Sequence, residues 1–386
     1  MLKLLKNADV YAPQPLGRQD ILIADEKIMR VAPDLHEYEA LPDVEVLDAG
    51  GKRVAPGLID LHVHVTGGGG EQGPASRVPE IQLSELIESG VTTVLGLLGT
   101  DGTSRSVENL LYKARALNQE GITAFMLTGS YQVPTVTLTG SVVRDIALIG
   151  ECVGVKVALS DHRSSNPTFD EFVRMASDAR MGGLISGKAG LVVMHMGAGR
   201  DMLKMVHRAL DETEIPVKTF LPTHCGRNDD LCDQAIAFAK RGGVFDLTGS
   251  SRQTAEKSCG RHIRRELEAG VTAEHITMSS DGCGSLPRFN DKGECIGLDY
   301  SSPLVLMQEL RWAVQHEGVA LETMLEVLTS TPAKVLSLTG RKGCIAPGAD
   351  ADLVVLDDEL QVVSVLARGK TARWDGKTLM RGTFEK

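Results

Sequence analysis

Apolar residues in the middle of the chain recur in short, strand-like runs about 30 residues apart. The intervals between the runs mostly carry apolar positions at helical spacing, as in 107–117 and 231–240. The expected strands begin near Leu58, Val91, Thr123, Gly154, Gly190, Val217, Val244 and Ile276. Eight consecutive strand–helix units are what a (β/α)8 barrel requires, and a doubly wound open sheet is the alternative.

The two ends of the chain show a different pattern, with short alternating strands and turns and no helix in the first 55 residues or so. The expected strands cover 20–24, 27–32, 44–51, 351–357 and 360–369, with a hairpin turn at 374–377. Two helical stretches, 303–318 and 321–338, lead back from the last barrel strand. The pattern therefore predicts an α/β protein with a TIM-like barrel over 56–340 and a small β-sandwich domain built from 1–55 and 341–386.

Composition and charge narrow the class of protein. The 386 residues are 42% hydrophobic, which is enough to bury a large core. A net charge of −10 argues against nucleic-acid binding, and the lack of an apolar run of about 18 residues argues against a membrane span. The N-terminus has no signal-peptide pattern, and the seven cysteines form no Cys-x-x-Cys pair. We therefore expect a cytoplasmic protein with reduced thiols.

Polar residues interrupt the apolar runs near the expected strand ends, where barrel enzymes carry their active sites. His62 and His64 are two residues apart on one strand, so both rings point to the same face. His195, His224 and Asp281 follow at the ends of the fifth, sixth and eighth strands. A metal ion would hold such imidazoles together, whereas the alternatives are hydrogen-bonded core histidines and, for Asp281, an ordinary Asp-Gly turn.

Lys156 lies in the expected fourth strand between two valines. Burial favours the neutral form of its amine, because an ammonium ion is costly in apolar surroundings. A neutral amine can take up CO2 to form a carbamate, which is an anionic ligand able to bridge two cations. Pairing of the ammonium with a barrel carboxylate is the alternative, and the chemistry of the residue does not choose between the two.

These residues and their surroundings resemble the amidohydrolase superfamily and, within it, the isoaspartyl dipeptidases. The His-x-His pattern with a strand-end aspartate is typical of the superfamily, while the glycine-rich loop with its glutamate and the Asp-His-Arg segment are typical of the dipeptidases. The similarity extends through nearly the whole chain, in the segments 56–64, 67–74, 96–101, 127–131, 160–164, 195–197, 221–228 and 279–285. Cys225 is given no function.

The resemblance implies a two-metal hydrolase, usually with zinc. His62 and His64 would bind one metal, His195 and His224 the other, and a CO2-derived carbamate on Lys156 would bridge them. Asp281 would ligate the first metal and act as general base and acid towards a hydroxide held between the metals. Tyr131 would stabilise the developing oxyanion, although its hydroxyl could instead simply face solvent.

The substrate expected from the resemblance is a β-aspartyl dipeptide, cleaved at its isopeptide bond. Such a dipeptide presents one ammonium group and two carboxylates. Glu71 is the candidate for the ammonium, and Arg163 and Arg227 are the candidates for the carboxylates. Gly69, Thr100 and Ser285 would complete the hydrogen bonds. The resemblance also implies a homo-oligomer.

Other functions stay open at this point. The first alternative is another amidohydrolase of the dihydroorotase, hydantoinase or D-aminoacylase type, whose substrates do not need the three charges of Glu71, Arg163 and Arg227. A non-catalytic assembly protein built on the barrel ranks below it, because all six proposed ligands are present. A deaminase of the same superfamily also ranks low, because the lysine bridge and the pair of arginines suit amide hydrolysis better.

Overall fold

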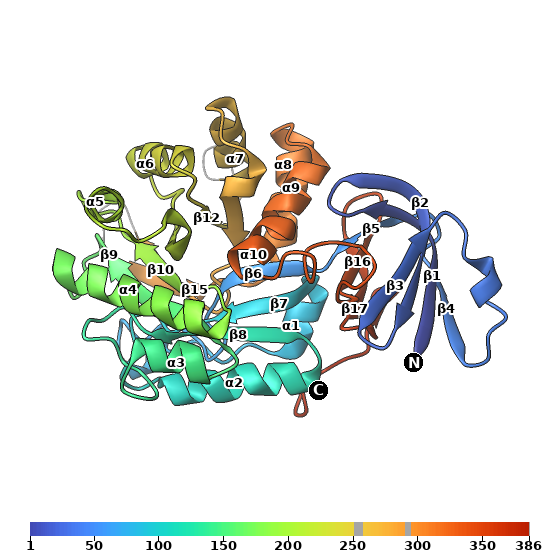
Figure 1. Ribbon diagram of the computed structural model, residues 1–386, viewed down its shortest axis with the longest axis horizontal. Coiled ribbons are helices and arrows are strands. Elements are labelled where there is room, and N and C mark those ends of the chain that lie inside the picture. The colour runs from blue at the N-terminus through green and yellow to red at the C-terminus, as the bar shows by residue number, and fades with distance from the viewer. Residues whose placement is uncertain (251–257, 290–294, 386) are drawn as a thin grey trace.

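The computed structural model describes residues 1–250, 258–289 and 295–385. Its larger part is a barrel of strands surrounded by helices, and a smaller strand-rich domain lies beside it (Figure 1). The blue N-terminal strands and the red C-terminal strands of Figure 1 meet in that smaller domain. None of the helices among the described residues is long and apolar enough to cross a membrane.

Eight parallel strands in the described part of the chain form the barrel. They are β6 (Leu58–Val63), β7 (Val91–Gly96), β8 (Thr123–Gly129), β9 (Cys152–Leu159), β10 (Leu191–Met196), β11 (Phe220–Thr223), β12 (Phe245–Thr248) and β13 (Ile276–Ser279). Strands β6 to β11 pair in chain order, and β12 pairs with β13. Two backbone hydrogen bonds join these sheets, from Cys225 to Asp246 (3.1 Å) and from His64 to Gly282 (2.8 Å). The ring therefore closes, and the predicted barrel is confirmed.

Helices cover the outside of the barrel. They are α1 (Leu83–Glu88), α2 (Val107–Glu120), α3 (Val142–Leu148), α4 (Phe169–Ser186), α5 (Lys204–Glu212), α6 (Asp229–Lys240), α7 (Cys259–Glu268), α8 (Val305–His316), α9 (Leu321–Leu328) and α10 (Ser330–Val335). Side chains of Ser106, Thr168, Asn228 and Ser258 accept an amide hydrogen at the helix starts. Such caps satisfy donors that the first turn leaves free, and they fix where each loop ends.

Several elements differ from those expected; the strand Leu2–Tyr11, for example, was not predicted. The stretch 321–338 is two helices broken at Thr329, because Pro332 has no amide hydrogen and its ring would meet the carbonyl of Leu328 in a continuous helix. The sixth strand starts at Phe220 after a short 3-10 turn, rather than near Val217. An unexpected hairpin, β14 (Ser285–Phe289) with β15 (Cys295–Tyr300), follows the last barrel strand.

The smaller domain contains one nine-stranded sheet made from both chain ends. Its strands are β1 (Leu2–Tyr11), β2 (Pro15–Ala24), β3 (Lys27–Ala32), β4 (Val44–Asp48), β5 (Arg53–Pro56), β16 (Leu353–Leu356), β17 (Val362–Ala367), β18 (Lys370–Trp374) and β19 (Lys377–Thr378). Antiparallel pairing of β5 with β16 joins the two ends. The domain has its own apolar core, which includes Leu5, Ile23, Val54, Leu353 and Leu366. This strand-rich unit agrees with the predicted β-sandwich.

Candidate active site

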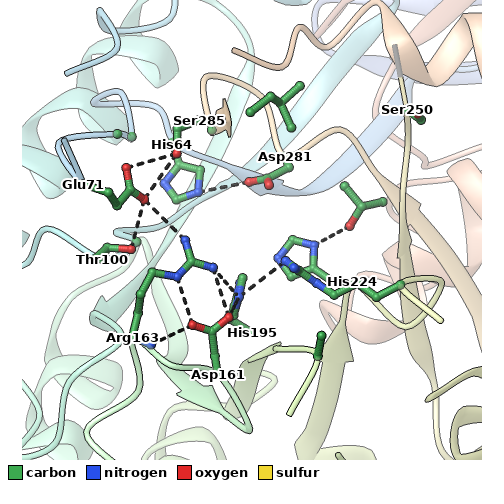
Figure 2. Close-up of a pocket in the computed structure, with 18 of the residues that line it drawn as sticks. His64, Glu71, Thr100, Asp161, Arg163, His195, His224, Ser250, Asp281 and Ser285 are labelled. Atoms are coloured by element: carbon green, nitrogen blue, oxygen red, sulfur yellow. Dashed lines mark hydrogen bonds and ion pairs between the residues drawn. The ribbon is translucent and has the colours of Figure 1, made fainter. Parts of the chain in front are cut away.

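Five of the six predicted metal ligands come together at the carboxyl ends of the barrel strands, and Lys156, inside β9, is near enough to interact electrostatically with His62, His224 and Asp281. Oδ1 of Asp281 lies 3.3 Å from Nε2 of His62 and 3.1 Å from Nε2 of His64. The ring centroids of His62 and His224 are 5.0 Å apart, and those of His195 and His224 are 4.5 Å apart. Figure 2 shows His64, His195, His224 and Asp281 around one pocket. Chain segments more than 200 residues apart in sequence thus supply one cluster.

The cluster fits a metal centre. A nitrogen of His62, a nitrogen of His224 and an oxygen of Asp281 all lie within 4.8 Å of one another. Nε2 of His62, Nδ1 of His64 and Nε2 of His224 are buried and have no hydrogen-bond partner among the described residues. Burial lowers the pKa of His62 and His224 well below the usual value and that of His195 to about 3. Buried imidazole nitrogens without hydrogen-bond partners, placed beside a carboxylate, are a suitable donor set for a divalent cation.

Lys156 is completely buried in β9. Burial lowers the pKa of its amine to about 7, so a large fraction is neutral at ordinary pH. Its Nζ has no hydrogen-bond partner, and no ion pair joins it to a carboxylate in the described part of the chain. The structure therefore disfavours the alternative in which Lys156 is held by a barrel carboxylate.

A buried network stands behind the histidines, and sequence reasoning missed it. Oγ1 of Thr223 lies 3.3 Å from Nδ1 of His62 and donates to Asp246 (2.6 Å). Oγ1 of Thr248 lies 2.6 Å from Nδ1 of His224. These contacts hold both rings with Nε2 directed into the cluster. Thr223 directly precedes His224, but nothing in the sequence marked Asp246 as its partner.

Asp60 is a second buried carboxyl that sequence reasoning missed. It accepts the amide hydrogens of His62 (3.2 Å) and Ser280 (3.1 Å), which links the first barrel strand to the chain just before Asp281. Burial raises the pKa of Asp60 to about 7. The sequence could have predicted this position, because Asp60 is two residues before His62 and shares its face of the strand.

Tyr131 follows β8 and is only 4% exposed. Its hydroxyl lies 2.6 Å from Nδ1 of His195. Burial raises the pKa of Tyr131 well above its usual value, so the phenol keeps its proton and can donate it in a hydrogen bond. The hydroxyl thus faces the cluster, and the alternative in which it faces solvent is wrong.

The glycine-rich loop after β6 approaches the site closely. Gly69 has a φ of +79°, and a Cβ on it would lie 2.3 Å from the carbonyl oxygen of Ser76. The buried guanidinium of Arg105 holds this loop by donating to the carbonyl oxygens of Gly68 (3.2 Å) and Val78 (2.8 Å). Glycine is required at this approach because a side chain would collide with backbone. No sequence signal identified Arg105.

Glu71, at the end of that loop, gathers three of the predicted substrate contacts. Its carboxylate accepts hydrogen bonds from Ser285 (3.1 Å) and Thr100 (3.2 Å) and lies 3.4 Å from Nη1 of Arg163. Figure 2 shows this group beside the histidine cluster. Glu71 and Arg163 were expected to meet different parts of a ligand, and in the structure they also face each other.

The two predicted arginines lie next to His195. Nη2 of Arg163 is 3.1 Å from Nε2 of His195, and Nη2 of Arg227 is 3.5 Å from the same atom. Asp161 holds Arg163 by two contacts, from Nε to Oδ1 (2.9 Å) and from Nη2 to Oδ2 (3.1 Å). Burial opposes ionisation of Asp161, yet hydrogen bonds from His195 and Arg163 keep its pKa well below the usual range. Sequence reasoning did not single out Asp161.

A cavity of about 1350 Å³ contains the site. Four residues of the cluster line it, together with Glu71 and both arginines; the four are His64, His195, His224 and Asp281. The hairpin β14–β15 contributes Leu286 and Leu298 to its wall. The space is ample for a small polar molecule with several charges. Barrel, cluster and charged cavity together are typical of a metal-dependent hydrolase.

The chain belongs to the amidohydrolase family, because the model of the Amidohydrolase family matches residues 53–372. Members of this superfamily are generally metal-dependent, in agreement with the cluster of histidine and aspartate residues.

Among solved structures, the chain is 43% identical to the β-aspartyl dipeptidase of Fervidobacterium islandicum AW-1 in complex with β-Asp-Leu dipeptide, with 98% of each chain covered and a TM-score of 0.91. A D-hydantoinase from a Thermus species has a TM-score of 0.68 at 18% identity over 100% of this chain and 98% of its own, which shows the fold alone. The L-hydantoinase of Paenarthrobacter aurescens is 22% identical over 92% of this chain and 85% of its own. The predicted similarity to the isoaspartyl dipeptidases is confirmed.

Proposed function

We propose that the protein hydrolyses the isopeptide bond of β-aspartyl dipeptides in a metal-dependent reaction. The observation that carries this proposal is the set of three charges, Glu71, Arg163 and Arg227, beside the histidine cluster. One anion and two cations match a ligand with one ammonium group and two carboxylates. The 43% identity to a β-aspartyl dipeptidase in complex with β-Asp-Leu supports the same substrate class.

The charges divide between the two halves of the dipeptide. Glu71 accepts the α-ammonium, with its carboxylate held by Thr100 and Ser285. Arg163 and Arg227 pair with the two carboxylates, because a guanidinium binds a carboxylate through two parallel hydrogen bonds. The backbone at Gly69, together with the hydroxyls of Thr100 and Ser285, supplies further hydrogen bonds.

The cluster would hold two divalent cations, most simply zinc, because imidazole and carboxylate ligands suit that ion. His62, His64 and Asp281 would hold one and His195 with His224 the other, and a carbamate formed on Lys156 would lie between them. When bound, such a pair supplies a Lewis acid and lowers the pKa of water enough for attack at neutral pH.

Two side chains of the protein handle the charges of the reaction. Asp281 accepts a proton from the attacking water and delivers it to the departing amine, which must be protonated to leave. The protonated hydroxyl of Tyr131 donates a hydrogen bond to the oxyanion that develops on the former carbonyl oxygen. Tyr131 is buried and only 17% of the Asp281 side chain is exposed, which limits the access of water and strengthens these interactions.

A panel of substrates tests the proposal. Metal-replete protein is expected to release leucine from β-Asp-Leu, while α-Asp-Leu, dihydroorotate and a simple hydantoin stay intact. Hydrolysis of the cyclic amides without β-Asp-Leu would instead assign the protein to the hydantoinase type. Absence of stoichiometric Zn, Mn, Co or Fe in the active protein would contradict the metal-dependent reaction.

Two variants separate metal binding from substrate binding. Lys156→Ala is expected to lose metal and activity together, because it removes the bridging ligand. Arg227→Ala is expected to keep its metal and to raise KM for β-Asp-Leu at least tenfold, because a charge-assisted pairing contributes roughly 1.5–3 kcal/mol. Elemental analysis and steady-state kinetics on the same preparations distinguish the two, and an Arg227→Ala variant without metal would contradict this division of roles.

The organisation of the molecule is proposed on the same grounds. Residues 56–340 would form the catalytic barrel, and residues 1–55 with 341–386 would form the accessory β domain. Assembly into a homo-oligomer and a cytoplasmic location stay predictions.

A further inference from the structure

Asp161 lies between a proposed metal ligand and a proposed substrate-binding arginine, in a constrained position. It follows β9 by two residues, after Ser160, whose φ is +53°. Only 4% of its side chain is exposed. A Cβ on Gly197, at the end of β10, would lie 2.5 Å from Cβ of Asp161, so the chain leaves space there for this residue. A non-glycine residue in the left-handed region and an obligatory glycine beside it are typical of a built site.

Both carboxylate oxygens of Asp161 are fully used. Oδ1 accepts the backbone amide (2.8 Å) and Nε (2.9 Å) of Arg163. Oδ2 accepts Nη2 of Arg163 (3.1 Å) and lies 3.0 Å from Nε2 of His195. The exposed ring of His162 adds a contact of 3.5 Å to Oδ1. One carboxylate therefore contacts both a proposed metal ligand and a proposed substrate-binding arginine.

The contact with Asp161 sets the tautomer of His195. An ionised carboxylate only accepts hydrogen bonds, so Nε2 of His195 carries the hydrogen and donates it to Oδ2. Nη2 of Arg163, 3.1 Å from Nε2, then donates to the same Oδ2 rather than to the ring. Nδ1 then keeps its lone pair, which receives the hydroxyl of Tyr131 at 2.6 Å. A histidine that donates one N–H to a carboxylate has the lone pair of its other nitrogen available for a metal ion, which would here take the place of the Tyr131 hydroxyl.

The same carboxylate aims Arg163. Nε and Nη2 are both occupied by Asp161, which leaves Nη1 as the terminal nitrogen directed at Glu71, 3.4 Å away. Nη1 is thus the part of the guanidinium presented to a ligand in the cavity. Loss of Asp161 would free the long side chain of Arg163 to adopt other rotamers, at a cost to substrate binding.

We propose that Asp161 is a positioning residue, whose one carboxylate fixes both the tautomer of His195 and the direction of Arg163. It thereby sets the position of the substrate carboxylate relative to the metal centre. The proposal rests on the proposed function for the part that concerns substrate. Its metal-binding part stands on the contact between Asp161 and His195 alone.

Asp161→Asn tests both parts. The amide keeps the shape of the carboxylate, but its NH2 group is a donor and would face a donor of His195 or of Arg163. Metal affinity, measured by competition with a chelator in the absence of substrate, is expected to fall 10–100-fold. KM for β-Asp-Leu on the metal-saturated variant is expected to rise about tenfold or more. Asp201→Asn is the matched control, since Asp201 is exposed and its carboxylate pairs only with Lys204 among the described residues.

Further measurements keep the result decisive. Combining Asp161→Asn with Arg163→Ala should leave KM no higher than Arg163→Ala alone, because both changes remove the same contact. Nitrogen NMR of histidine-labelled, metal-free wild-type protein should show His195 protonated at Nε2, which needs no variant to fold. Wild-type metal affinity in Asp161→Asn, or a His195 protonated at Nδ1, would overturn the proposal. Failure of the wild type to cleave β-Asp-Leu would overturn the function and leave the metal result standing.

Discussion

Replacement of Lys156 by methionine should make the metal-free protein more stable while it destroys the metal centre. Lys156 is completely buried, and its Nζ has no partner in the described part of the chain. Methionine has a similar length, no charge and enough flexibility to fill the same space. The variant therefore removes a costly buried amine at little loss of packing, but it also removes the group that would form the carbamate.

The size of the effect follows from the pKa of Lys156, which burial lowers from 10.5 to about 7. Each pKa unit corresponds to about 1.4 kcal/mol, so burial of the Lys156 amine lowers the free energy of unfolding by about 5 kcal/mol below pH 7. At such a pH the amine is charged in the unfolded protein, and folding must remove water from that charge. The penalty shrinks as pH rises from 7 to 10.5, to about 3 kcal/mol at pH 8, and then vanishes. Imperfect packing of methionine offsets roughly 1 kcal/mol of the gain.

Thermal unfolding of both proteins measures the difference, in chelator and in CO2-free buffer at pH 6, 8 and 10. For a chain of 386 residues, about 1 °C of Tm corresponds to each kcal/mol, so the variant should unfold roughly 2–4 °C above the wild type at pH 6 to 8 and near it at pH 10. With metal and bicarbonate restored, the order should reverse, because only the wild type binds metal. A difference that does not change with pH would refute the reasoning.

Two further changes test Tyr131 beside the cluster and Glu266 in the helix α7. Tyr131→Phe should lower kcat by roughly 10²–10³ while metal content stays normal, and loss of metal would show that the hydroxyl serves the centre instead. Glu266 in α7 is buried with no hydrogen-bond partner among the described residues, and burial raises its pKa to about 8. The folded state thus keeps this proton, while the unfolded state loses it above pH 4.5. The Tm of Glu266→Gln should therefore rise relative to that of the wild type as pH increases from 5 to 8. A Tm difference that does not change with pH would contradict the buried, protonated state of Glu266.

The sequence predicted those features that depend on local periodicity. Alternation along β6 places His62 and His64 on one face, and the regular spacing of apolar runs assigns each of the other ligands its own strand end. Because the carboxyl ends of all barrel strands meet at one mouth, the cluster followed from the fold. The burial of Lys156 also followed, since its neighbours in the strand are apolar, whereas the lack of a partner for its amine did not.

Features that depend on loop conformation were not predictable in this way. Asp161 reaches His195 and Arg163 only because Ser160 adopts a left-handed conformation, which no apolar pattern records. The guanidinium of Arg105 binds carbonyl oxygens of a loop nearly 40 residues earlier. The break at Thr329 depends on Pro332. Proline interrupts a helix but is tolerated in a first turn, so the sequence does not tell at which residue one helix ends and the next begins.

The pairing of β5 with β16 has a consequence for how the molecule is made. Val54 lies opposite Val355, so about 300 residues must be synthesised before the strands at the start of the chain can complete their sheet. Until then, β5 presents an unpaired edge during the synthesis of the entire barrel, and closing so large a loop is slow. The nascent N-terminal strands therefore depend on a rapidly folding barrel to bring β16 to them, and conditions that delay the barrel should expose this edge to association with other chains.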